Sequence, residues 1–120
     1  MSQNTLPLPQ TLLYLLVTDG PWTGTLIPMK ATQFLIGRGP HCHLRPTSTQ
    51  VEDYHCSIMV RDGRFFLCDR NSLTGTFLNG RQIFGKVELL DQDCLRVGPL
   101  QFRVKISSVQ EQKGCQEPFS

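Results

Sequence analysis

Three short segments of the chain carry side chains that could bind an anion or take part in acid–base chemistry. They are FLIGRG at 34–39, VEDYHC at 51–56 and DRNSLTGTFLNG at 69–80. Arg38 follows an apolar run and a glycine, and its guanidinium offers a planar set of donors that never loses its positive charge. Taken alone, an arginine at the end of a strand is most often a solvated surface residue. Arg38 is therefore interpreted together with the other two segments, in the order in which all three occur along the chain.

A metal site is the first alternative, because His41, Cys42 and His43 are consecutive and His55 and Cys56 follow nearby. Structural zinc sites show ligand spacings such as C-x-x-C or H-x-x-x-H, and the chain has neither. Successive residues of a strand also point to opposite faces, so neighbouring side chains rarely converge on one ion. The sequence predicts no metal and no cofactor.

The acidic and hydroxyl side chains do not form a recognisable catalytic set either. Ser72 and Thr76 have no base in the pattern except His55, and neither a P-loop nor a nucleophile elbow occurs. In turn contexts an aspartate commonly bonds its own backbone, and this is the context of Asp62, Asp69, Asp91 and Asp93. We expect a protein that is not an enzyme.

Composition narrows the class of protein. The 120 residues are 39% hydrophobic and carry a net charge of +2 from 12 basic and 10 acidic residues. This is enough apolar material for one core, and the charge is too small to predict binding to nucleic acid or to an anionic membrane. Residues 12–17 form an apolar run too short to cross a bilayer, without the flanks of a signal peptide. Five scattered cysteines argue against a disulfide framework, which fits the cytoplasmic location that we expect. We also expect a monomer.

The apolar pattern predicts an all-β fold. Short apolar stretches recur between Gly, Pro, Asn and Asp, which is typical of strands and turns. The expected strands are 12–18, 25–29, 33–37, 43–44, 55–60, 64–68, 76–78, 81–83, 86–89, 93–97 and 101–106. About eleven short, mostly antiparallel strands predict a two-sheet β-sandwich over 11–107, between flexible segments at 1–10 and 108–120. Trp22 is expected to plug the edge of the core.

The connections between these strands are of two kinds. Type I′ hairpin turns need positive φ at both central residues, and they are predicted at Asp62-Gly63 and Asn79-Gly80. Two longer connections, 45–54 and 69–75, interrupt the regular spacing. A rigid sandwich commonly carries its function on such loops, so we expect the working surface there.

In this order, the three segments resemble the signature of a forkhead-associated (FHA) domain, and the likeness extends over roughly residues 12–106. That family is a β-sandwich whose end loops bind phosphothreonine. The resemblance implies that Arg38, after Gly37, gives its guanidinium to the phosphate and that His55 ties loops together by hydrogen bonds. The third segment matches the family at Asp69, Ser72, Gly75, Thr76, Asn79 and Gly80. Of these, Gly75, Thr76, Asn79 and Gly80 are expected to be structural residues of the loop and of the turn that follows.

Two positions depart from the family pattern. Glu52 stands where the family has a serine that donates a hydrogen bond to phosphate, and Thr74 stands where an asparagine holds the bound peptide backbone. Two unit charges about 4 Å apart repel by roughly 1 to 4 kcal/mol between bulk-water and surface-like screening, so Glu52 should weaken phosphate binding. An ion pair between Glu52 and Arg38 is left open. Ser48 or Thr49 could supply a replacement hydroxyl.

The resemblance implies a non-enzymatic interaction module without a cofactor. Its expected ligand is a phosphothreonine-containing segment of a partner protein, bound weakly or replaced by an unmodified segment because of the two departures. The alternative is a structural assembly or oligomerisation domain that pairs through a sheet face or edge. The contact residues expected for the first reading are Arg38, Ser48, Thr49, Glu52, Leu73 (where a threonine is common) and Thr74.

Overall fold

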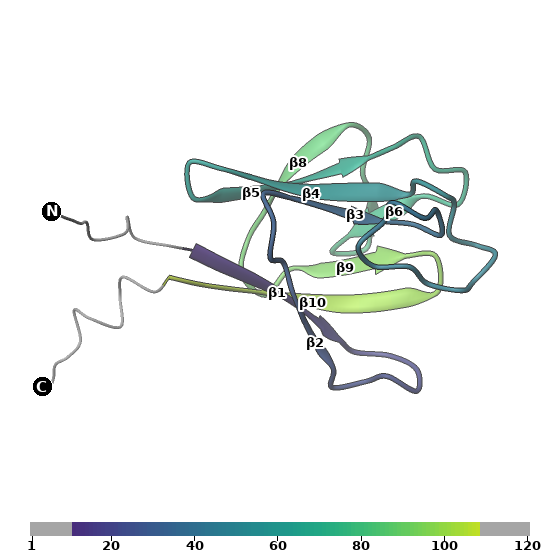
Figure 1. Ribbon diagram of the computed structural model, residues 1–120, viewed down its shortest axis with the longest axis horizontal. Coiled ribbons are helices and arrows are strands. Elements are labelled where there is room, and N and C mark those ends of the chain that lie inside the picture. Colours follow the sequence, from purple (N-terminus) through teal and green to yellow (C-terminus); the bar gives the residue numbers. More distant parts are fainter. Residues whose placement is uncertain (1–10, 109–120) are drawn as a thin grey trace, which may run out of the picture.

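Two antiparallel sheets face each other across one core (Figure 1). The computed structural model describes residues 11–108. One sheet has six strands in the order β2-β1-β10-β9-β6-β7 and the other has four in the order β3-β4-β5-β8. The strands are β1 (Thr11–Val17), β2 (Leu26–Pro28), β3 (Gln33–Ile36), β4 (Cys56–Arg61), β5 (Arg64–Asp69), β6 (Thr76–Leu78), β7 (Arg81–Gln82), β8 (Lys86–Leu89), β9 (Cys94–Val97) and β10 (Leu100–Ser108). The predicted all-β sandwich is confirmed, with ten strands in the described residues.

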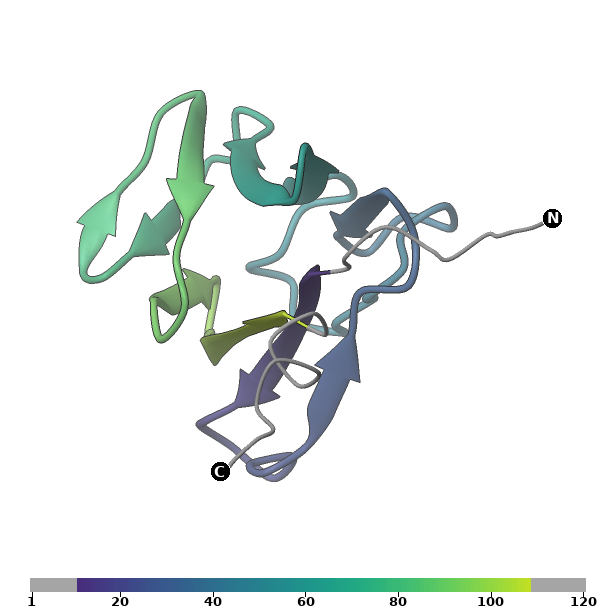
Figure 2. The same cartoon turned by 90° about the vertical axis from the view of Figure 1, so that its left-hand side faces the viewer.

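Along β3, β5 and β9 every second side chain is directed to the core, as the period of a β-strand predicts, whereas the first three residues of β4 are all buried. In β10, Phe102 and Val104 are buried, while the alternating Gln101 and Arg103 lie on the outer face of the six-stranded sheet. The other sheet contributes residues such as Ile58 in β4. Figure 2, seen from the side on which β1 begins and β10 ends, shows the two layers with the core between them.

The hairpin turns follow the sequence pattern. Asp62 and Gly63 have φ values of 55° and 74°, and Asn79 and Gly80 have φ values of 53° and 84°. Both central residues of each turn thus have the positive φ that a type I′ hairpin needs. The turns set the registers of β4 with β5 and of β6 with β7.

Two expectations about the scaffold are wrong. Residues 43–44 do not form a strand: Leu44 makes a single parallel bridge to Ile36. The pairing cannot extend far, because Pro46 has no N–H to donate. Trp22 is not a core plug, since 71% of its surface is exposed. It lies in a connection that bonds to itself, Thr23 N–H to Gly20 O at 3.2 Å, so its ring stays outside the core.

The expected flexible segments 1–10 and 108–120 fall outside the described residues, apart from Ser108, which pairs with Thr11 at the end of β10. Within residues 11–108 there is no helix long and apolar enough to cross a membrane.

Candidate functional site

Arg38 is held at one end of the sandwich by its own backbone. Its N–H donates to Glu52 O at 2.9 Å, and the next N–H, of Gly39, donates to Asp53 O at 3.0 Å. The two segments approach so closely that a Cβ on Gly37 would lie 2.2 Å from Asp53 O. Glycine is therefore needed at position 37 for the approach itself, and the side chain of Arg38 remains exposed.

A surface pocket of about 420 Å³ lies at this end, lined by Arg38, Arg45, Pro46 and Thr47. The isolated bridge explains the pairing of the two arginines, because Gly37 N–H donates to Leu44 O at 3.1 Å and so sets Arg45 beside Arg38. The lining contains two guanidinium groups, one hydroxyl and no carboxylate, which is a donor set suited to a doubly charged oxyanion.

Arg45 and Thr47 are members of this pocket that the sequence analysis did not single out. The predicted hydroxyls lie elsewhere in the same loop: Ser48 Oγ accepts Gln50 N–H at 3.1 Å, and Thr49 is exposed outside the lining. The only sequence signal for Arg45 was its place at the start of the 45–54 loop. Its position beside Arg38 depends on a contact between segments, which local pattern does not predict.

Glu52 does not pair with Arg38. Its carboxylate accepts the backbone N–H of Leu73, and the one ion pair in the described part of the chain joins Arg64 to Glu88. A second bond between the same two loops runs from Thr74 Oγ1 to Gln50 O at 2.6 Å. Both residues that depart from the family pattern therefore tie loop 45–54 to loop 69–75.

His55 lies under these loops and is fully buried. Its Nδ1 accepts Glu52 N–H at 3.2 Å, so its Nε2 carries the proton and donates to Gly75 O at 2.8 Å. Its backbone carbonyl accepts Arg70 N–H at 3.0 Å. His55 has no exposed surface with which to touch a ligand, and it links both loops to the strand that follows.

Asp69 organises the second loop from inside. Its carboxylate accepts Ser72 Oγ–H at 2.6 Å and Thr76 Oγ1–H at 2.7 Å, and also the N–H groups of Asn71 and Ser72. Partial burial would raise the pKa of Asp69, but these hydrogen bonds outweigh it and hold the pKa below its ordinary value. The loop thus depends on an ionised carboxylate that donates nothing to a ligand.

Asn79 and Gly80 shape the turn after this loop and do not line the arginine pocket. The Asn79 side chain donates to Asp93 at 3.0 Å and accepts Cys94 N–H at 2.9 Å, which fastens the turn to β9. Gly75 has a φ of +91°, a conformation that favours glycine. Across residues 11–108, no group of three or more His, Cys, Asp or Glu side chains is placed to hold a metal ion.

The family model of the FHA domain matches residues 34–98, which contain Arg38, both loops and the Asn79 turn. The chain belongs to the FHA domain family. A curated relative, the FHA domain-containing protein FhaB of Mycobacterium tuberculosis, is 28% identical over 85 residues, which are 71% of this chain and 55% of the relative. The chain thus spans about half the length of the curated relatives it matches.

Solved FHA structures have the same fold. One, from a study of phosphothreonine-dependent FHA domain interactions, has a TM-score of 0.70 at 28% identity and covers 78% of this chain and 95% of its own. EmbR of Mycobacterium tuberculosis, solved in complex with a low-affinity phosphopeptide, has a TM-score of 0.74 at 25% identity. That match covers 80% of this chain and 24% of EmbR.

Proposed function

We propose that this FHA domain binds a phosphothreonine-containing segment of a partner protein at the pocket of Arg38, Arg45 and Thr47. The observation that carries the proposal is the lining itself: two arginines line one pocket, and no acidic residue does. A phosphate carries close to two negative charges near neutral pH and accepts several hydrogen bonds. Two FHA relatives of similar fold were studied for phosphothreonine-dependent interactions or solved with a phosphopeptide, which supports the same ligand class here.

Glu52 lowers the expected affinity without removing the site. Its carboxylate is bonded to Leu73 N–H rather than to Arg38, so the guanidinium of Arg38 stays available. The charge of Glu52 nevertheless lies in the same loop as Arg45 and repels a dianion. The proposal is therefore phosphate-dependent binding that is weaker than the arginine pair alone would give.

The role is recognition rather than catalysis, with no cofactor. The hydroxyls of Ser72 and Thr76 donate to Asp69, and His55 is buried and fully bonded. These groups serve the scaffold, which supports a module that is not an enzyme. Cys42, Cys56, Cys68 and Cys94 are free thiols, which fits a reducing compartment such as the cytoplasm.

Isothermal titration with phosphothreonine peptide libraries and their unphosphorylated twins tests the proposal. Loss of a charge-assisted hydrogen-bonding partner costs about 1.5 to 3 kcal/mol, so Arg38→Ala should weaken phosphopeptide binding by about tenfold or more. The matched control is Arg81→Ala, an exposed arginine at the far edge of the six-stranded sheet, which should leave affinity unchanged. Equal binding of the two peptide forms would overturn phosphate recognition.

Assembly through a sheet face or edge stays the alternative. Sedimentation velocity over a range of concentrations distinguishes the two, because the proposed module remains a monomer and an assembly domain grows in size. Self-association that is unaffected by Arg38→Ala would favour the alternative.

A further inference from the structure

The outer face of the six-stranded sheet carries cations that the proposed site does not use. Strand register places Phe77 of β6 opposite Arg96 of β9, and Arg96 opposite Gln101 of β10. The next row places Arg103 of β10 beside Leu16 of β1. These side chains alternate with the buried residues of the same strands, so they share the face that points away from the core.

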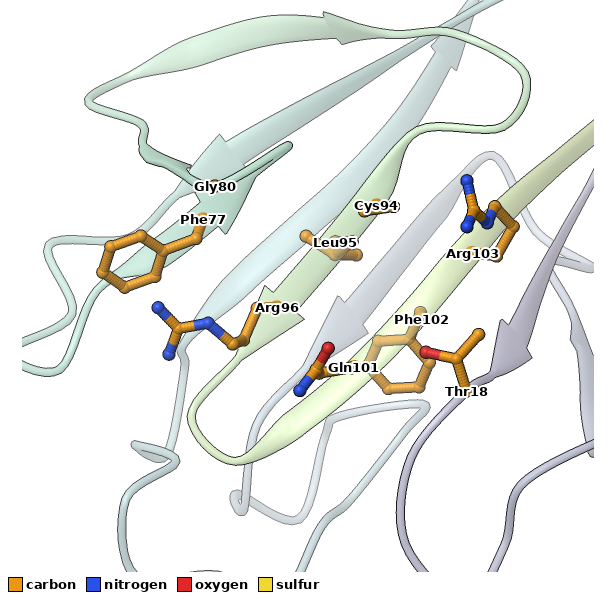
Figure 3. A pocket seen from close by; sticks show the side chains of 9 residues that line it. All are labelled: Thr18, Phe77, Gly80, Cys94, Leu95, Arg96, Gln101, Phe102 and Arg103. Atoms are coloured by element: carbon orange, nitrogen blue, oxygen red, sulfur yellow. The ribbon is translucent and has the colours of Figure 1, made fainter.

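This face is hollowed into a pocket of about 400 Å³, here called the outer-face pocket (Figure 3). Figure 3 shows the Arg96 side chain reaching toward Phe77, while Arg103 projects from β10 on the other side of the pocket. The lining has two guanidinium groups and no carboxylate; it consists of Thr18, Phe77, Gly80, Cys94, Leu95, Arg96, Gln101, Phe102 and Arg103.

The guanidinium of Arg96 packs against an aromatic ring and not against a carboxylate. Its guanidinium carbon lies 4.0 Å from the centroid of the Phe77 ring, so the ring fixes the direction of the charge. The opposite sheet provides an internal comparison. There Arg64 lies 5.7 Å from the Phe66 centroid, and Glu88 completes the arrangement with two hydrogen bonds of 3.0 and 2.7 Å. The Arg96–Phe77 pair has no such carboxylate within the described residues.

Arg103 gives the pocket its second cation. One of its Nη atoms donates to Gln92 O at 3.0 Å, a neutral acceptor that leaves the charge uncompensated and other donors free. Lys105, two residues further along β10, lowers the pKa of Asp91 as a minor contribution after hydrogen bonds to that carboxylate. Lys105 thus has an acidic neighbour without forming an ion pair, and Arg96 and Arg103 likewise form no ion pair within residues 11–108.

Apolar side chains border these cations on β1 and β2. Leu16 lies opposite both Arg103 and Leu26, and 55% of the surface of Leu26 is exposed. One row further, Tyr14 lies opposite both Lys105 and Pro28. Charged side chains on β10 therefore lie next to apolar side chains on β1 and β2, and neighbouring strands are about 5 Å apart.

We propose that the outer-face pocket, together with the adjoining Leu16 of β1, binds an acidic segment of a partner protein, with carboxylates on Arg96 and Arg103 and apolar side chains on Phe77 and Leu16. Charge complementarity selects this occupant, since unpaired guanidinium groups favour carboxylates in a bidentate geometry. The adjacent hydrocarbon adds area that a free inorganic anion would not cover. This contact needs no phosphothreonine, and it is independent of the pocket at Arg38.

The probe is a fluorescein-labelled heptapeptide in which glutamate alternates with phenylalanine and leucine, followed by fluorescence anisotropy on the full chain. A twin with glutamine in place of glutamate is the ligand control. An exposed ion pair is worth up to about 1 kcal/mol, or about fivefold in affinity. Arg96→Gln and Arg103→Gln should each weaken binding by about that factor, and Arg96→Lys should recover part of it.

Two variants serve as matched controls. Arg64→Gln removes an arginine that lies over a phenylalanine on the opposite sheet. Arg38→Ala removes an arginine that is proposed to bind the phosphate of a phosphopeptide. Both variants should leave the heptapeptide affinity unchanged. The melting temperature of each variant, measured by circular dichroism, separates a lost contact from a lost fold. Equal binding of the glutamine twin, equal weakening by Arg64→Gln, weakening by Arg38→Ala, or no binding at millimolar protein would each overturn the proposal. Binding to phosphatidylserine vesicles but not to the heptapeptide would also overturn it.

Discussion

His55 and Gly75 are joined by a buried hydrogen bond of 2.8 Å between Nε2 and the carbonyl oxygen. Because Nδ1 of the same ring accepts Glu52 N–H, one side chain links loop 45–54, which contributes to the arginine pocket, to loop 69–75. The position of each loop is thus determined by a residue that has no exposed surface. Substitutions that never touch a ligand should therefore alter binding.

Replacing His55 tests this link. His55→Ala leaves a cavity and an unpaired Gly75 carbonyl, so the free energy of unfolding should fall by about 2 to 4 kcal/mol. Urea denaturation measures the loss. His41→Ala is the control because His41 is exposed, and its effect should stay within about 0.5 kcal/mol. Equal effects of the two variants would contradict the bridging role.

The close approach at Gly37 makes a graded prediction. An added Cβ would lie 2.2 Å from Asp53 O at Gly37 but 2.9 Å at Gly39. Gly37→Ala should therefore destabilise the domain more than Gly39→Ala. The free energy of unfolding should fall by at least about 1 to 3 kcal/mol in Gly37→Ala. Urea denaturation checks this order: the two midpoints are compared, provided that both variants have the same dependence of the unfolding free energy on urea concentration. A reversed order would mean that the backbone contact is not tight.

The Asp69 carboxylate predicts a pH dependence of stability. Its pKa in the folded chain is lower than in the unfolded chain, where about 3.9 is expected. The stabilisation is fully present above the unfolded value and is lost as the pH falls through the folded value. Asp69→Asn should thus be less stable than the parent at pH 7, and the difference should shrink below about pH 4. Denaturation at a series of pH values measures it, and a constant difference would contradict the prediction.

Neutralising Glu52 should strengthen phosphopeptide binding. Glu52→Gln keeps a side-chain oxygen that can accept Leu73 N–H but removes the charge, so affinity should rise by about fivefold, equivalent to roughly 1 kcal/mol. Glu88→Gln is the control, because Glu88 lies on β8 and pairs with Arg64. Isothermal titration with a phosphothreonine peptide reads both.

The double change Glu52→Ser with Thr74→Asn restores the family pattern at both positions. We expect it to raise phosphopeptide affinity above that of Glu52→Gln, since serine adds a donor and asparagine adds a paired donor and acceptor. If neither Glu52→Gln nor the double variant tightens binding, the charge of Glu52 does not limit the site.

The sequence by itself determined the elements whose cause is local. Alternation in residues 101–106 predicts β10, and the Asp62-Gly63 and Asn79-Gly80 dipeptides predict hairpins with positive φ, as observed. These features depend on side-chain period and on backbone sterics within a few residues. The ordered motifs, each weak, also sufficed to identify the family later matched over 34–98.

Only the tertiary structure decided which distant groups meet. A single β-bridge at Leu44 places Arg45 beside Arg38. The Glu52 carboxylate accepts a hydrogen bond from Leu73 N–H, and Trp22 is exposed. The tertiary structure also brought Phe77, Arg96 and Arg103 together on an outer sheet face. Such contacts depend on strand order and register between segments far apart in the chain, and the local pattern of residues carries little information about either.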